Sequence, residues 1–72
     1  MEIVKTVDVR VQINVPAFAN FVVMEDLGDQ YLIKLMSNAR WRFESDSEMF
    51  SGHPGVFDLK VNKSEVYTVE VL

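Results

Sequence analysis

Cysteine is absent from this chain of 72 residues, and histidine occurs once, at position 53. The absence of cysteine excludes a disulfide framework, and one histidine without cysteine excludes the Cys/His zinc sites that often stabilise small folds. A chain of this length forms a single domain, residues 1–72, and folding buries only roughly 60% of the surface that the unfolded chain exposes. Stability must therefore come from apolar packing, within the chain or across a subunit interface.

Long apolar runs are also lacking. The longest, from Val15 to Met24, is interrupted by Pro16 and Asn20, whereas a membrane span needs roughly 18 apolar residues. The first residues alternate polar and apolar side chains, where a signal peptide needs a continuous apolar core. We therefore expect no membrane contact and a cytoplasmic location, with which the absence of cysteine agrees.

Basic residues are few, since seven lysines and arginines stand against eleven acids and give a net charge of -4. This balance disfavours a general affinity for nucleic acid, which depends on basic side chains that displace phosphate counterions. Apolar residues make up 49% of the chain. Because so small a domain has a limited interior, some of them should stay near the surface, which favours a homo-oligomer or a stable partner.

Alternation of apolar and polar side chains is the strongest pattern in the sequence. From Val7 to Val15 every odd position is β-branched and every even position is polar, the period of two that a strand with one buried face requires. The segment 31–36 is apolar on most of both faces, so we expect it to be a central strand. Segments 56–61 and 65–71 alternate again, and we expect them to pair as a hairpin.

The segment between Pro16 and Gly28 allows two interpretations. In the first, a strand from about Asn20 to Glu25 pairs with the next strand across a turn at residues 27–29. In the second, a short helix begins at Pro16 and ends at Gly28. The adjacent β-branched residues at 22 and 23 favour the hairpin.

A capping-box spacing occurs at Ser45-Asp46-Ser47-Glu48 and predicts one short helical turn near residues 46–51. The remaining elements are five to six strands. A flat sheet would leave one face exposed, whereas coiling buries the apolar face and reduces the open edges. The sequence therefore predicts an all-β fold, either a small antiparallel barrel or a strongly curved sheet of the SH3-like or OB-like kind.

Residues suited to catalysis are scarce. His53 lies between Gly52 and Pro54, in a turn that would not hold a general base in place. The acids lie in the most polar segments, where carboxylates are solvated and keep ordinary properties. No segment has the glycine and lysine pattern of a phosphate-binding loop or the ligand spacing of an EF-hand. We expect a protein without enzymatic activity, cofactor or metal.

The most distinctive segment is Arg40-Trp41-Arg42-Phe43. On a strand the two rings share one face and the two arginines share the other, so the favoured interpretation places the rings in the core and the arginines on the surface. In a second interpretation Trp41 faces outward and stacks on bases while the arginines hold phosphates. In a third the arginines and the acids that follow form a contact surface for another protein.

The functional hypothesis is a non-catalytic interaction protein that binds a larger macromolecular partner. One example is a virus- or mobile-element-encoded inhibitor of a host nucleic-acid-processing enzyme, whose acidic side chains compete for a basic cleft. The alternative is a small nucleic-acid-binding β-barrel that uses the Arg/Trp strand. The predicted partner-binding residues are Arg40, Trp41, Arg42, Glu44, Asp46, Glu48, Glu25, Asp26 and Asp29.

Overall fold

The computed structural model describes residues 5–8 and 10–72, and the side chains from Arg10 onward. Within this part of the chain there are eight strands and no helix, which confirms the all-β class. None of these residues belongs to a helix that could cross a membrane. The strands are β1 (Lys5–Asp8), β2 (Val11–Val15), β3 (Ala19–Asp26), β4 (Gln30–Ser37), β5 (Trp41–Glu44), β6 (Met49–Gly52), β7 (Gly55–Asn62) and β8 (Tyr67–Val71).

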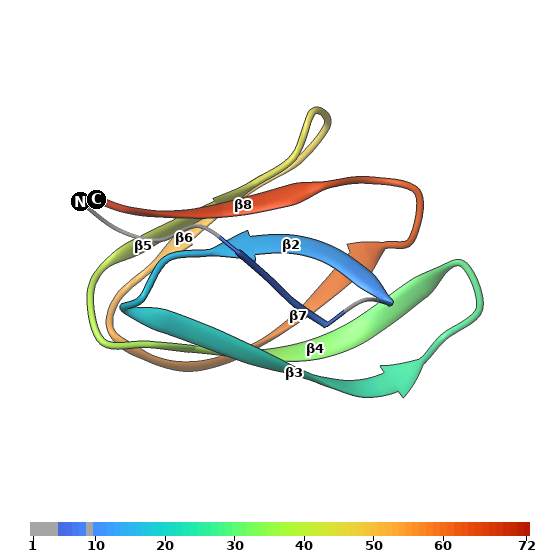
Figure 1. The fold of residues 1–72 in the computed structure, drawn as a ribbon, viewed down its shortest axis with the longest axis horizontal. Helices are drawn as coiled ribbons and strands as arrows, with labels where there is room; N and C mark the ends of the chain where they lie inside the picture. Colours follow the sequence, from blue (N-terminus) through green and yellow to red (C-terminus); the bar gives the residue numbers. More distant parts are fainter. Residues whose placement is uncertain (1–4, 9) are drawn as a thin grey trace.

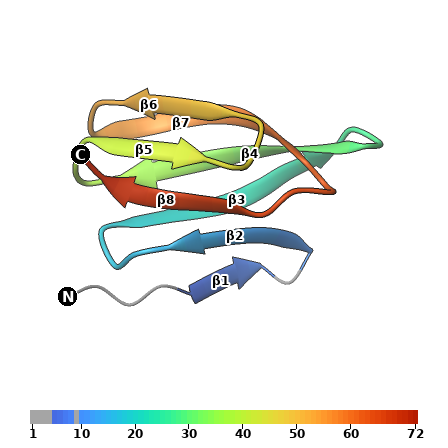
Figure 2. The same ribbon diagram turned by 90° about the horizontal axis from the view of Figure 1, so that it is seen from above.

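The strands form two sheets that pack face to face (Figure 1, Figure 2). The large sheet has the order β1-β2-β8-β5-β6, and the small sheet has the order β3-β4-β7. Neighbouring strands are antiparallel except β2 and β8, which run parallel with Ile13 opposite Tyr67. The strands do not close into the predicted small barrel, and they form two layers in place of one strongly curved sheet. The described chain has eight strands where five to six were expected, and these divide into two layers.

The core lies between the two sheets. The nearly fully buried apolar side chains are Val11, Ile13, Val15, Phe21, Ile33, Leu35, Trp41, Phe43, Val61, Tyr67 and Val69. Full burial of such a side chain stabilises a fold by about 1.5–3 kcal/mol relative to exposure. Both sheets contribute aromatic and branched aliphatic side chains to this core. Contacts between these side chains therefore hold the two sheets together.

The predicted strand from Val7 to Val15 is divided between β1 and β2, which pair antiparallel with Asp8 opposite Val11. In β2 the expected alternation is present, with Val11, Ile13 and Val15 buried and the residues between them less so. Two parts of the predicted alternation, Val9 and the side chain of Val7, lie outside the described residues. Residues 1–4 lie outside them as well, and the expectation of no signal peptide depends partly on these residues.

The hairpin interpretation of residues 16–28 is confirmed, because β3 pairs with β4 across a turn at residues 27–29. Gly28 has a φ of +99°, a conformation that favours glycine, and its N–H donates to Asp26 Oδ1 over 2.9 Å. β4 lies between β3 and β7, as expected of a central strand.

The predicted helical turn near residues 46–51 is not present. The Glu48 N–H donates to Ser45 Oγ over 3.2 Å, as a capping box would have it, but the Ser45 N–H also donates to the Glu48 carbonyl over 2.9 Å. Together these bonds close a hairpin turn, because a serine side chain can satisfy a backbone N–H in a turn as well as at a helix start. The chain continues as β6, with Phe50 opposite Phe43 in the register.

The predicted hairpin of the last two strands is also wrong. β7 pairs with β4 in the small sheet, whereas β8 pairs with β5 and β2 in the large sheet. Alternation shows that a strand has one buried face but does not show which strand it pairs with. Where the chain crosses between the sheets, the Asn62 N–H donates to the Tyr67 hydroxyl over 3.0 Å. This is the bonding pattern of a tyrosine corner, in which a buried tyrosine fixes a crossing between two sheets.

Candidate interaction surface

Trp41 lies in the core, which confirms the favoured interpretation of the Arg/Trp strand. It is 2% exposed, and Phe43 is fully buried. The indole N–H donates to the His53 carbonyl over 2.9 Å, and the ring meets Phe57 edge to face with the ring centres 5.3 Å apart. A ring held in this way offers no face on which a base could stack.

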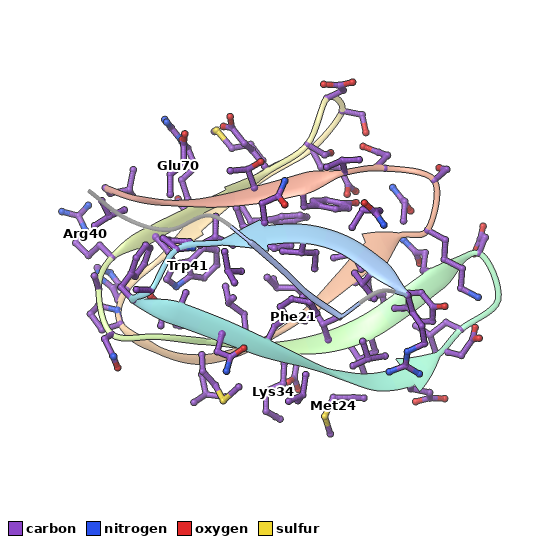
Figure 3. All side chains as sticks on the ribbon, viewed as in Figure 1. Phe21, Met24, Lys34, Arg40, Trp41 and Glu70 are labelled. Atoms are coloured by element: carbon purple, nitrogen blue, oxygen red, sulfur yellow. The ribbon has the colours of Figure 1, made fainter. Side chains whose placement is uncertain are left out.

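The two arginines of this strand have different surroundings. Arg42 faces Glu70 directly in the register, with 2.7 Å between Nη2 and Oε1, and its Nε lies 3.3 Å from Glu44 Oε1. The hydrogen bond to Glu70 and the charge of Glu44 raise the pKa of Arg42. Arg40 is exposed at one end of the sandwich (Figure 3), and its guanidinium has no ion-pair partner among the described residues.

The β3–β4 turn lies beside the connection between β7 and β8 at one end of the sandwich (Figure 1). The Lys63 N–H donates to the Asp29 carbonyl over 3.1 Å, and Lys63 Nζ lies 2.7 Å from Asp26 Oδ1. The hydrogen bonds from Lys63 and from the Gly28 N–H lower the pKa of Asp26. The turn is therefore anchored to a segment more than thirty residues further along the chain.

The β5–β6 turn is anchored to the same connection through Glu65. The Glu65 carboxylate accepts hydrogen bonds from the hydroxyls of Ser45 and Ser47 and from the side-chain amide of Asn62. These bonds lower the pKa of Glu65, and the bond from Ser45 has the largest effect. Sequence reasoning missed this residue, because the S-x-x-E spacing pointed Ser45 to a local partner and nothing in the pattern indicated a carboxylate twenty residues away.

Glu48, also in the β5–β6 turn, is held by a buried tyrosine. The Tyr67 hydroxyl donates to Glu48 Oε1 over 2.6 Å while it accepts the Asn62 N–H. Burial raises the pKa of Tyr67 to about 12. This predicted partner-binding residue is therefore largely engaged within the fold.

These contacts anchor the two turns that carry most of the predicted acids to the β7–β8 connection. Within this set the side chains of Glu25, Asp29 and Asp46 are exposed and have no hydrogen bond or ion pair with other described residues. Of the other predicted residues, Glu44 pairs with Arg42 on the outer face of the large sheet, Arg40 lies elsewhere, and Trp41 is buried. We call this surface the acidic end and define it by the carboxylates of Glu25, Asp26, Asp29, Asp46, Glu48 and Glu65.

Two hollows in the described surface lie away from the acidic end, on either side of the segment 16–18. One, of about 400 Å³, includes Arg42 and Glu70 in its lining, and these two are paired with each other. The other, of about 420 Å³, has no ionisable side chain in its lining. Within the described residues no group of three or more His, Cys, Asp or Glu side chains is placed to hold a metal ion.

No protein family, curated protein sequence or solved structure matches this chain. The arrangement of the surface is therefore the main guide to function. Its most distinctive part is the acidic end, which three connecting segments build together.

Proposed function

We propose that the protein is a non-catalytic interaction protein that binds a basic surface of a larger macromolecular partner through its acidic end. The observation that carries this proposal is the anchoring of the β3–β4 turn and the β5–β6 turn to the β7–β8 connection. The carboxylates of Glu25, at the end of β3, Asp29 and Asp46 are exposed and have no hydrogen bond or ion pair with other described residues.

The hydrogen bonds inside the acidic end support a binding role. Lys63 and Glu65 tie the two turns to the β7–β8 connection, so the exposed carboxylates are carried by turns that are already ordered. Binding then costs less conformational entropy than it would for flexible loops. The net charge of -4 adds long-range attraction to a positively charged partner and raises the association rate.

The partner we propose is a protein whose basic cleft normally receives nucleic acid. Carboxylates on an ordered surface can occupy positions where phosphates would bind, and the chain then acts as a competitive inhibitor of a nucleic-acid-processing enzyme. A virus or a mobile element is the kind of source in which such small inhibitors occur.

The test is displacement of a labelled DNA duplex from purified nucleases, helicases and polymerases, followed by fluorescence anisotropy. We expect the wild-type chain to displace the duplex from at least one enzyme. The triple variant Glu25→Gln/Asp29→Asn/Asp46→Asn should bind that enzyme at least tenfold more weakly, which corresponds to about 1.4 kcal/mol.

The matched control is Glu44→Gln/Asp58→Asn/Glu70→Gln. It also removes three negative charges, but at positions outside the acidic end. We expect it to displace the duplex nearly as well as the wild type. Equal losses in both triple variants would mean that net charge, and not this surface, determines binding.

Direct nucleic-acid binding through Arg40, Trp41 and Arg42 has no observation in its favour. Trp41 is buried, and Arg42 is matched by two carboxylates. The same anisotropy assay without enzyme measures any binding of the duplex by the chain itself.

A further inference from the structure

The outer faces of the two sheets differ in character. Side chains on the outer face of the large sheet are mainly polar or charged, whereas those on the small sheet include several apolar residues. Val22, Met24 and Val56 are 45%, 52% and 58% exposed, and Leu32 and Met36 are half-buried beside them. Met24 and Lys34 point away from the core on this side (Figure 3). Nothing in the described chain covers this face.

Charges on this outer face are balanced. Lys34 on β4 and Asp58 on β7 are opposite in the register, with 2.9 Å between Nζ and Oδ1. Lys60 and Glu25, each opposite Leu32 in the register, add one positive and one negative charge. The face is therefore neutral in a chain of net charge -4. Two acidic chains would meet with the least repulsion on such a face.

We propose that the outer face of the small sheet is the contact surface of a homodimer. A two-fold axis that runs along the strands, between β4 and β7, would place β4 of each copy over β7 of the other. Lys34 would then face Asp58 of the second copy, and the reverse contact would follow from the symmetry. Met36 would face Val56 of the second copy in the same way.

The charge pattern selects this axis among the arrangements whose two-fold axis runs along the strands. If β4 packed on β4, Lys34 would face Lys34 of the second copy, and if β7 packed on β7, Asp58 would face Asp58. Like charges brought together in an interface disfavour both arrangements. Only the arrangement of β4 on β7 turns the neighbouring opposite charges into complementary contacts between copies.

The size of the face sets the strength of association. In this arrangement β4 and β7 of the two copies overlap over roughly 10 by 26 Å, and β3 lies beside this overlap. This is below what a stable specific interface buries, so the dimer should be weak and should dissociate on dilution. We expect the molar mass in sedimentation velocity to rise from 8.3 kDa towards twice that value as the concentration increases from about 10 µM to about 1 mM.

Charge reversal separates this proposal from a general effect on folding. Lys34→Glu makes the face negative and Asp58→Lys makes it positive, so each variant alone should stay monomeric over the whole range. An equimolar mixture should dimerise again, because the new carboxylate of one chain meets the new ammonium of the other. Circular dichroism checks that each variant is folded, and Val56→Glu replaces either variant if it is not.

Arg40→Glu is the matched control, since it makes the same change in net charge at an exposed position outside this face. It should dimerise as the wild type does. The proposal is overturned if the wild type stays monomeric at the highest concentration. It is also overturned if the mixture associates no more than its components, or if Arg40→Glu and Lys34→Glu act alike.

Discussion

Tyr67 connects the core to the turns at the acidic end. Its ring is fully buried and stacks on Phe43 with the ring centres 5.0 Å apart. Its hydroxyl meets both Glu48 and the Asn62 N–H. A buried polar group that loses its partner costs about 1–3 kcal/mol. We therefore expect Tyr67→Phe to lower the free energy of unfolding by this amount, measured by urea denaturation at pH 7.

Tyr67 should also make the fold sensitive to alkali. Its pKa is 10.0 in an unfolded reference and about 12 in the fold, so the stability that it contributes is complete below pH 10 and is lost as the pH rises towards 12. A shift of this size corresponds to about 2–3 kcal/mol. Urea denaturation between pH 9 and about pH 12 measures the loss. Tyr67→Phe should lack this component, and an identical pH profile in both proteins would contradict the assignment.

Gly52 lies directly under the Trp41 ring. A Cβ at this position would be 2.5 Å from Trp41 Cζ2 and 2.8 Å from Cε2. Forcing extra atoms into a packed site costs about 1–3 kcal/mol, so we expect Gly52→Ala to destabilise the fold by this amount. In a Trp41→Phe background the ring is smaller and the same substitution should cost less. Additive losses in thermal denaturation of the double variant would show that the two sites do not interact.

At the scale of single residues the sequence predicted which side chains are buried better than it predicted their hydrogen-bond partners. The inward position of Trp41 and Phe43 followed from alternation, because side chains on a strand point to opposite faces in turn. The bonds of Tyr67 and Glu65 could not be predicted, because they join positions that only the crossing between the sheets brings together.

At the scale of the elements, Glu65 joins two turns and makes their contact dependent on pH. Its pKa is lowered in the fold, so the stability that it contributes is present above pH 4.5 and is lost as the pH falls through the folded value. Glu65→Gln should lower the melting temperature by a few degrees at pH 7. The difference from the wild type should shrink at pH 3, as followed by circular dichroism.

The control for this prediction is Glu70→Gln, which removes the carboxylate of the exposed pair with Arg42. Exposed pairs contribute little to stability, so the melting temperature should change less. A difference between Glu65→Gln and the wild type that does not depend on pH would show that protonation of Glu65 is not the cause.

The elements themselves were predicted where the signal was local. The β3–β4 hairpin follows from a glycine-containing turn between two β-prone segments. The helical turn was wrong because the same serine bond closes a hairpin, and the last hairpin was wrong because alternation does not identify the neighbouring strand. The acids were named in the sequence as partner-binding residues, but the anchoring of their turns depends on the β7–β8 connection.

At the scale of the whole molecule, β8 holds the large sheet together. It lies between β2 and β5, and its side chains Tyr67 and Val69 belong to the core. Without it the large sheet would separate into two hairpins, and isolated hairpins are at best marginally stable in water. We expect removal of residues 66–72 to abolish the fold, seen as loss of the β signal in circular dichroism. Removal of the exposed Leu72 alone should leave the fold in place.

The central position of β8 has a consequence for biosynthesis. A nascent polypeptide that has left the ribosome only as far as residue 66 presents the edges of β2 and β5 unpaired, and such edges attract chaperones, proteases and other chains. No stable intermediate that contains only the earlier strands is expected. The polypeptide should instead become resistant to proteolysis in a single step, after the segment that contains Tyr67 has emerged from the exit tunnel.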